Sequence, residues 1–244
     1  MAYRLEAIFK SYGNEPVLSG IDLELAQVGI CVVLGPSGCG KTTLLNVIAG
    51  LTCFESGRRL GFEGAHFSYA FQEPRLLPWL DARANITYAL KGAGGNMEKA
   101  EQTVDILLEA AGLANAAHSL PSELSGGMRQ RLSLVRAFAY PADILLLDEA
   151  FKAVDLRTKI ELMDVFLELE KKEPRSVVAV THDIEEAVYL ADRVIVLSER
   201  PTKIIDTFKI DVPREDRTLG SPATMDAESR LYRLALGDRI SSRH

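Results

Sequence analysis

Short apolar runs recur along the chain, separated by stretches in which apolar residues return every three or four positions. The short runs occupy residues 30–34, 144–147, 176–180 and 193–197. Such runs are typical of strands buried on both faces of a parallel sheet, where no alternation with polar residues is needed. They predict strands of a mostly parallel central sheet.

Helical spacing appears in several stretches between these runs. It predicts helices over residues 43–49, 97–112, 157–172 and 183–191, because their apolar positions fall on one helix face. Alternating strands and helices imply right-handed crossovers and an α/β fold.

The beginning, middle and end of the chain depart from that alternation. Residues 3–34 contain apolar runs with turn signals between them, which predicts antiparallel strands. Residues 84–132 have few β-branched side chains, which favours an inserted helical lobe. We therefore expect one domain. Its expected parts are a core lobe of 1–83 and 133–206, the insertion of 84–132, and a tail of 207–244 that is loose apart from a short helix at 228–236.

Composition and charge narrow the class of protein. The chain has 244 residues, 47% hydrophobic and 25% charged, as in an ordinary soluble globular protein. Its net charge of −6 gives no basic footprint, so no nucleic-acid partner is expected. Cys31, Cys39 and Cys53 lack metal-ligand spacing, which indicates a reducing compartment. Since no apolar run has the length of a membrane span or a signal core, we expect a cytoplasmic protein that meets a membrane only through a partner.

The most informative motif directly follows the first buried run. Residues 35–42 fit the phosphate-loop pattern G-x-x-x-x-G-K-[ST] at every fixed position, between strand 30–34 and helix 43–49. Its glycines let backbone N–H groups approach a triphosphate, and the helix N-terminus adds partial positive charge. Lys41 is expected to reach the β- and γ-phosphates, and Thr42 to offer its hydroxyl to Mg²⁺.

A second Gly-rich motif precedes another helical stretch. Residues 124–131 read Leu-Ser-Gly-Gly-Met-Arg-Gln-Arg. Ser-Gly-Gly before a helix is again a backbone donor site for phosphate. One triphosphate does not need two such sites, unless the second serves a nucleotide held by another copy of the chain. The alternative is an ordinary capping turn, because Ser is a favoured N-cap and Gly a common loop residue.

Charged residues follow two of the buried runs. Asp148 and Glu149 end the run at 144–147, where carboxylates are costly unless they have a function. Asp148 is expected to hold Mg²⁺ through its water shell, and Glu149 to polarise the attacking water. His182 follows the run at 176–180 and could contact a γ-phosphate. A surface histidine, or a hydrogen-bonded histidine of the core, is the alternative.

Together these motifs resemble the ATP-binding subunit of an ATP-binding-cassette (ABC) transporter. The resemblance covers roughly residues 3–206. Its motifs stand in family order: Tyr12, the loop 35–42, Gln72, the signature Leu124 to Gln130, Asp148 and Glu149, Asp155, and His182. The implied fold is a P-loop NTPase core with a mostly parallel sheet, an N-terminal antiparallel β part and an inserted α-helical lobe. The implied cofactors are ATP and Mg²⁺.

The resemblance also implies how a site is built. Two copies form a head-to-tail dimer, and each ATP lies between the phosphate loop of one copy and the signature of the other. Tyr12 stacks on adenine, which the physics of aromatic contacts supports; a surface aromatic in a turn is the alternative. The implied ATP contacts are Tyr12, Gly35, Pro36, Ser37, Gly38, Cys39, Gly40, Lys41, Thr42 and Thr43. The implied catalytic residues are Glu149, His182, Lys41 and Gln72; the metal ligands are Thr42, Gln72 and Asp148; the trans signature is Ser125, Gly126, Gly127 and Gln130; and Asp155 is in the dimer loop.

Two segments narrow the family. Residues 71–80 and 126–131 are similar to those of bacterial importers of nitrate, alkanesulfonates and taurine. The resemblance thus implies an ATP-hydrolysing subunit at the cytoplasmic face of the membrane, partnered by permease subunits and indirectly by a solute-binding protein. Importers of thiamine or pyrimidine precursors are also relatives, so the solute stays open. A soluble ABC-type ATPase of translation or DNA repair is the other alternative, although such chains usually carry two cassettes or a long coiled-coil insertion.

A few positions depart from the family pattern. Pro usually follows the catalytic Glu, where this chain has Ala150, and Lys152 stands where Ser or Gly is more usual. Lys152 therefore puts a cation near the expected dimer seam, which bears on the coupling of the two sites. The stretch 57–71 is also shorter than expected, which predicts a reduced edge hairpin.

Two further expectations concern exposed groups. Residues 72–80, with the apolar cluster 76–79, are expected to line the groove that receives a short permease helix; the alternative is that Trp79 belongs to the core of the helical lobe. Cys39, inside the phosphate loop, is expected to be the thiol through which modifying reagents inhibit, while Cys31 stays protected in its strand.

Overall fold

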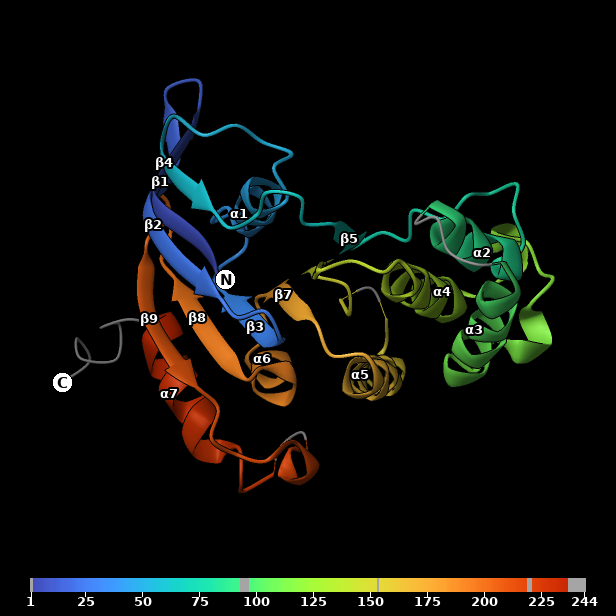
Figure 1. Ribbon diagram of the computed structural model, residues 1–244. Helices are drawn as coiled ribbons and strands as arrows, with labels where there is room; N and C mark the ends of the chain where they lie inside the picture. The colour runs from blue at the N-terminus through green and yellow to red at the C-terminus, as the bar shows by residue number, and fades with distance from the viewer. Residues whose placement is uncertain (1, 93–96, 153, 219–220, 237–244) are drawn as a thin grey trace. The chain divides into compact units, whose positions relative to one another are not determined.

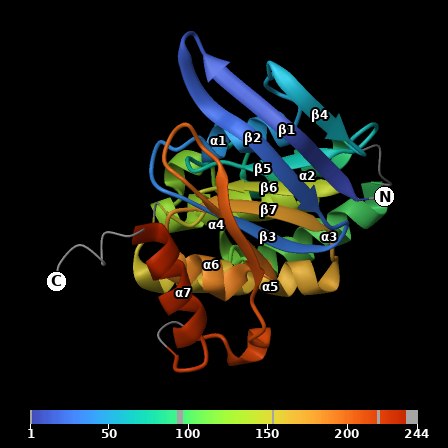
Figure 2. The ribbon, with the colours of Figure 1, turned by 90° about the vertical axis from the view of Figure 1, so that its left-hand side faces the viewer.

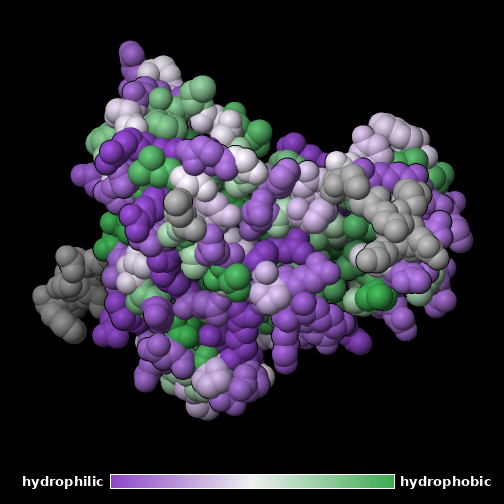
Figure 3. All heavy atoms as spheres, in the orientation of Figure 1, coloured by the Kyte–Doolittle hydropathy of each residue, from purple (hydrophilic) through white to green (hydrophobic). Residues whose placement is uncertain are grey.

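The protein folds into two compact units, seen here in a computed structural model. The first comprises Met1–Gly64 and Ser176–His244, and the second comprises Ala65–Arg175. The structure describes residues 2–92, 97–152, 154–218 and 221–236. Polar residues cover most of the face in Figure 3, and apolar residues form small separate patches there.

The first unit opens with a three-stranded antiparallel sheet. β1 (Tyr3–Tyr12) pairs with β2 (Glu15–Leu25) on one side and with β4 (Ser56–Leu60) on the other, as Figure 2 shows. Apolar side chains such as Leu5 are buried on one face of this sheet. The antiparallel strands expected to lead into the central strand at 30–34 are therefore confirmed over residues 3–25.

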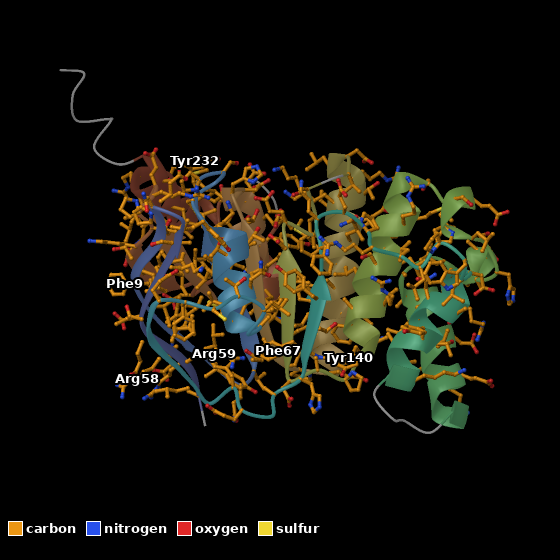
Figure 4. The ribbon with its side chains drawn as sticks, turned by 90° about the horizontal axis from the view of Figure 1, so that it is seen from above. Phe9, Arg58, Arg59, Phe67, Tyr140 and Tyr232 are labelled. Atoms are coloured by element: carbon orange, nitrogen blue, oxygen red, sulfur yellow. The ribbon has the colours of Figure 1, made fainter. Side chains whose placement is uncertain are left out.

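Edge strand β4 is tied to helix α1 (Lys41–Ile48) by one arginine. Nε and Nη2 of Arg59 donate to the carbonyl of Ile48 at 3.0 and 2.9 Å. The neighbouring Arg58 pairs with a carboxylate of β1 instead, and Figure 4 labels both side chains. The short stretch expected as a reduced hairpin thus contains a five-residue edge strand that is anchored to α1.

The phosphate-loop strand lies inside the main sheet. In the first unit the strand order is β7-β3-β8-β9; the first three strands are parallel and β9 is antiparallel to β8 (Figure 1). Their bounds are β3 Gly29–Leu34, β7 Ser176–Thr181, β8 Arg193–Leu197 and β9 Ile204–Lys209. The apolar runs predicted the first three strands correctly. No such run marks β9, because half-buried and exposed residues alternate along it.

Helices of the first unit pack on this sheet. α6 (Ile184–Leu190) contacts β3 and β7, and α7 (Met225–Leu236) contacts α6 and β8. The segment before α7 is better ordered than the sequence suggests. Its buried Arg217 donates to several carbonyl oxygens, including that of Ala191 at 2.6 Å. This arginine therefore ties the start of the tail to the end of α6.

The second unit combines two strands with helices. β5 (Phe67–Ala70) is parallel to β6 (Ile144–Asp148), and α4 packs against β5 and the other three helices. The helices are α2 Ala82–Gly92, α3 Met97–Ala110, α4 Gly126–Ala139 and α5 Leu156–Lys172, with 3₁₀ turns at Ala114–Ala116 and Pro121–Glu123. The expected helical stretch is present, whereas the lobe boundaries at 84 and 132 stay a prediction. The Gly-rich residues 92–96 predict a flexible break between helices, and of these, 93–96 lie outside the described residues.

Candidate nucleotide-binding site

Lys41 is the first residue of α1, and its side chain folds back over the loop. Its Nζ donates to the carbonyl of Gly35 at 2.9 Å and to that of Pro36 at 3.0 Å. The residue is only 5% exposed. A buried ammonium group requires oxygen partners, and a phosphate offers the same kind of acceptor as these carbonyls. The geometry suits a lysine that exchanges carbonyl for phosphate oxygens.

Gly40 shows why the end of the loop needs glycine. It precedes α1 with a φ of 112°, in a region that side chains rarely adopt. A Cβ at this position would lie 2.6 Å from Cγ1 of Val17 in β2. The hydroxyl of Thr202 donates to the neighbouring carbonyl of Cys39. The end of the loop is therefore packed against β2 and held by a hydrogen bond from Thr202.

The outer rim of the loop is open, unlike its base. Pro36, Ser37 and Gly38 are exposed, and a Cβ on Gly38 would meet nothing within 4 Å. Thr42 is exposed in the first turn of α1, while Thr43 is buried. An exposed loop at a helix N-terminus, next to a lysine, fits a bound triphosphate.

The donor set for Mg²⁺ is sparse. The described residues contain no group of three or more His, Cys, Asp or Glu side chains that could hold a metal ion. Mg²⁺ is usually held by one or two protein groups together with substrate phosphates and waters. The Thr42 hydroxyl and the Asp148 carboxylate are groups of this kind. They belong to different units, and their joint role as metal ligands stays a prediction.

His182 is placed beside the start of the phosphate loop. It follows β7, whose last residue, Thr181, accepts a hydrogen bond from the Gly35 N–H at 3.3 Å. His182 is exposed, and Asp183 after it caps α6 by accepting from the Glu186 N–H at 3.1 Å. The alternative of a core histidine is therefore wrong, and the position suits contact with an anion in the loop.

Tyr12 is an exposed residue at the end of β1. The ammonium of Lys10 lies 4.8 Å from the centroid of its ring, and the same ammonium pairs with Glu55. The ring is free of the core and stands at the turn before Gly13, so both the adenine contact and the surface-aromatic interpretation are compatible with its position. Its role in stacking stays a prediction.

Asp148 ends β6 in the second unit. Its Oδ2 accepts a hydrogen bond from the Tyr69 hydroxyl at 3.2 Å. Burial and the adjacent carboxylate both raise the pKa of Tyr69, which keeps this phenol a hydrogen-bond donor. The contact orients Asp148. Sequence reasoning did not single out Tyr69, because in the sequence it is one more residue of a short strand and belongs to no motif.

Glu149 follows in an unusual backbone conformation, with a φ of 47°. Such values are uncommon for a residue with a side chain and tend to occur at functional sites. The turn closes with a hydrogen bond from the Lys152 N–H to the Glu149 carbonyl at 3.1 Å. The side chains also meet, since Lys152 Nζ lies 2.8 Å from Glu149 Oε2. The cation expected near the dimer seam is therefore paired with the expected catalytic carboxylate.

The signature segment caps α4. The Oγ of Ser125 accepts a hydrogen bond from the Met128 N–H at 3.2 Å, so the capping alternative correctly describes its local role. A Cβ on Gly126 would meet nothing within 4 Å, which leaves this face open. Gln130 is buried, and its amide donates to the carbonyl of Ala150. It links α4 to the turn after Glu149, and its part in a trans contact stays a prediction.

Thr158 connects the signature to the start of α5. Asp155 caps α5 by accepting from the N–H and the hydroxyl of Thr158 at 3.1 and 2.7 Å. These hydrogen bonds, the hydroxyl first, hold the pKa of Asp155 below its usual value. A Cβ on Gly127 would lie 3.0 Å from Cγ2 of the same threonine. The signature and the residue expected in the dimer loop thus share one neighbour.

Gln72 is an exposed residue after an ordered aromatic pair. The rings of Tyr69 and Phe71 stack with centroids 4.1 Å apart, and the guanidinium of Arg75 lies 3.9 Å from the Phe71 centroid. Arg136 of α4 donates to the Arg75 carbonyl at 2.6 Å. The segment that carries Gln72 is therefore connected to Asp148 through Tyr69 and to α4 through Arg75.

The segment after Gln72 is organised by Asn85, which sequence reasoning missed. This fully buried amide accepts from the Leu77 N–H at 2.9 Å and donates to the carbonyls of Leu77, Leu80 and Asp81. Trp79 lies on the loop that Asn85 holds and is 71% exposed. The alternative that Trp79 belongs to the core is wrong.

The expectation for the loop thiol is also wrong. Cys39 is 2% exposed, and burial raises its pKa, although Lys41 opposes the rise. Burial likewise raises the pKa of Cys31 to about 11. Cys53 is the exposed thiol. The sequence shows that Cys39 belongs to the loop. It does not show that the Sγ atom is turned inward, toward Gly35.

Comparison with known proteins places these motifs in a family. A family model described as ABC transporter matches residues 18–152, more than half of the chain. The chain belongs to the ABC transporter family. Curated relatives match 94–100% of the chain. The chain is therefore an ATP-binding and ATP-hydrolysing subunit, and its phosphate loop is not an isolated match to a short motif.

Three relatives illustrate this likeness. The chain is 40% identical over 241 residues to the aliphatic sulfonates import ATP-binding protein SsuB 2 of Burkholderia cenocepacia (strain HI2424), covering 94% of this chain and 88% of that protein. It is 41% identical to SsuB 1 of Xanthomonas axonopodis pv. citri (strain 306), with 96% and 93% covered. It is 40% identical to SsuB of Mycobacterium avium (strain 104), with 100% and 93% covered.

Solved structures agree on the fold. A dimeric structure of the ATP-binding cassette MJ0796, in a post-hydrolysis state bound to ADP and phosphate, has a TM-score of 0.73 and 28% identity, and covers 85% of this chain and 98% of that one. A second dimeric structure of MJ0796, described as a bacterial ABC transporter cassette, has a TM-score of 0.72. The expected ABC ATPase fold is confirmed.

Among the described residues, no helix is both long enough and apolar enough to cross a bilayer.

Proposed function

We propose that this ABC ATPase powers the import of an organosulfonate or a similar small anion. The observation that carries the proposal is the identity of about 40% to sulfonate import ATP-binding proteins over almost the whole chain. The import of sulfonates, for which those proteins are named, is inferred for this chain. It agrees with the Gln72 segment, which is similar to the same group of importers.

The phosphate loop supplies the binding step. Lys41 would leave the carbonyls of Gly35 and Pro36 for the β- and γ-phosphate oxygens, and the backbone N–H groups of the loop would surround the same phosphates. Thr42 and Asp148 would hold Mg²⁺. When bound, this ion neutralises the charge of the phosphates. Tyr12 would stack on the adenine ring.

Glu149 would act on the attacking water. The carboxylate accepts a proton from water as the water oxygen bonds to the γ-phosphorus, and the bond from that phosphorus to the leaving oxygen of ADP breaks. ADP carries away the bonding electron pair. Gln72 and His182 would contact the γ-phosphate and report its presence. The chain's own residues therefore contribute mainly positioning and charge stabilisation.

A second copy would complete each site. Ser125 and Gly126 lie at an exposed helix start whose N-terminal dipole attracts phosphate. We infer that this face, with Gly127 and Gln130 behind it, meets a nucleotide held by another copy in a head-to-tail dimer. Asp155 would lie at the seam.

The permease would dock on the second unit. Trp79 stands exposed after the Gln72 segment. A hollow of about 340 Å³ nearby is lined by Leu80, Tyr88 and five other residues of 80–91. Exposed aromatic side chains of this kind often anchor protein interfaces. Such docking would put the cassette at the cytoplasmic face of the membrane, with a solute-binding protein joining through the permease.

Growth on defined sulfur sources tests the proposed solute. A strain that lacks this chain should grow on sulfate but fail on an alkanesulfonate as the only sulfur source. A plasmid copy should restore growth, and a Lys41→Ala copy should not. Unimpaired growth on alkanesulfonates, with a defect on nitrate or on a thiamine precursor instead, would assign the cassette to another importer of the family.

A further inference from the structure

The turn after β6 places a cation on the carboxylate that the proposed reaction requires. Lys152 Nζ is 2.8 Å from Glu149 Oε2, within the distance of a strong hydrogen bond between charged groups. The Glu149 side chain is 13% exposed and that of Lys152 is 42% exposed. The carboxylate is therefore mostly enclosed, while its partner reaches it from the solvent side.

The geometry of this turn is fixed by its neighbours. Phe151, between the two charged residues, is buried and lies against the Phe166 ring of α5, with ring centroids 6.1 Å apart. Gln130 of α4 donates to the Ala150 carbonyl. The backbone bond from Lys152 to Glu149 closes the turn. Because contacts with two helices fix the backbone of the turn, the lysine and the carboxylate stay within reach of each other.

The pair occupies an oxygen that catalysis needs. A carboxylate that orients or deprotonates water must accept a hydrogen bond from that water. While Lys152 donates to Oε2, that oxygen is already engaged and is not available to accept a hydrogen bond from the attacking water. A lysine at this place therefore opposes the reaction of the very residue that it contacts.

We propose that Lys152 is a positioning residue that restrains Glu149 and slows turnover until the pair opens. The proposal rests on the proposed role of Glu149 as the residue that acts on water. The partner that the structure gives the lysine is the carboxylate that acts on water and not a group expected to bind the phosphates, so its removal should act on the rate of turnover rather than on nucleotide affinity.

Steady-state kinetics of the full-length protein test the restraint. Lys152→Met keeps most of the side-chain length but removes the charge, and it should raise kcat by about two- to fivefold, the range expected for a part-exposed ion pair. KM for ATP should stay at the wild-type value. Lys152→Arg, which can still pair with Glu149, should behave as wild type. Arg157→Met is a matched control, because Arg157 pairs with Glu161 on α5.

A second background shows whether the effect passes through Glu149. In Glu149→Gln the cation has no charged partner, so Lys152→Met should no longer change the residual rate. An unchanged or lower kcat in Lys152→Met, an equal rise in Arg157→Met, or a rise that persists in Glu149→Gln would each overturn the restraint. Wild-type turnover in Glu149→Gln alone would instead refute the proposed role of Glu149, so the two failures are distinguishable.

Discussion

Backbone strain marks one residue of the second unit above the others. Glu149 has a positive φ directly after a buried strand, at a cost of roughly 1–2 kcal/mol for a residue with a side chain. A protein keeps such a conformation where the surrounding structure requires it. The turn that requires it here is the one that brings Lys152 to the carboxylate.

Substitution of this carboxylate should separate binding from turnover. Glu149→Gln removes the proton acceptor but keeps the shape, so ATP should still bind while kcat falls about 10²–10⁴-fold. The variant should also accumulate as ATP-bound dimers, which size-exclusion chromatography with bound-nucleotide analysis would detect. Turnover at the wild-type rate would remove Glu149 from the mechanism.

Thiol reactivity should follow burial rather than position in the motif. At pH 7 a maleimide should label Cys53 first, while Cys39 and Cys31 react slowly because burial raises the pKa of both thiols. Peptide mass spectrometry of a time course would give the order. Cys53→Ser should therefore abolish fast labelling; persistent fast labelling would mean that the loop opens and exposes Cys39.

At the scale of elements, the strands and helices of the core could be predicted, and several links between them could not. Apolar runs locate β3, β6, β7 and β8 because burial on both faces leaves an unbroken signal. β9 could not be predicted in this way, because one of its faces is exposed and its sequence has no unbroken apolar run. The burial of Asn85 could not be predicted either, since nothing in the sequence distinguishes a buried amide from an exposed one.

The candidate site was predictable to a similar extent. The loop, the signature and the paired carboxylates have fixed spacings, so their positions follow from the sequence. The contact between Lys152 and Glu149 does not, because it depends on a turn that Phe151 and Gln130 fix through tertiary contacts. The sequence indicated only that Lys152 places a cation near the expected dimer seam.

The signature helix should act on a nucleotide of another copy. Mixing Lys41→Ala subunits with Ser125→Arg subunits gives a heterodimer with one intact composite site and one site damaged twice. Partial ATPase recovery above either variant alone is expected, provided that one site can turn over independently. If Ser125 acted within its own chain, every site would be damaged, and a nucleotide photo-crosslink from position 125 would stay in that chain.

At the scale of the whole molecule, the two units divide the motifs between them. The phosphate loop and His182 belong to the first unit, and the carboxylates, the Gln72 segment and the signature belong to the second. The expected docking surface therefore shares the second unit with Glu149, whereas the phosphate loop belongs to the first, so a change to the docking surface should leave the loop intact.

Trp79 should matter for assembly more than for folding. Trp79→Ala removes an exposed aromatic side chain, so melting temperature and basal ATPase of the isolated subunit should stay near wild type. Co-purification with the permease should weaken, by roughly 2 kcal/mol if this residue is an interface hot spot. Tyr232→Ala, another exposed aromatic residue but on α7, is the matched control. Equal assembly of both variants would place the docking site elsewhere.

The resting contacts of Lys41 also set which anions the loop can capture. Its ammonium already has two carbonyl partners, so an incoming anion must compete with them rather than merely attract a hydrated cation. Hydrogen bonds to ionised acceptors are roughly twice as strong as those to neutral ones, so a highly charged polyphosphate wins this exchange more readily than a monovalent anion does. A loop with these contacts should therefore prefer a polyphosphate to chloride or nitrate, so that small anions, including an imported one, compete poorly for the nucleotide site.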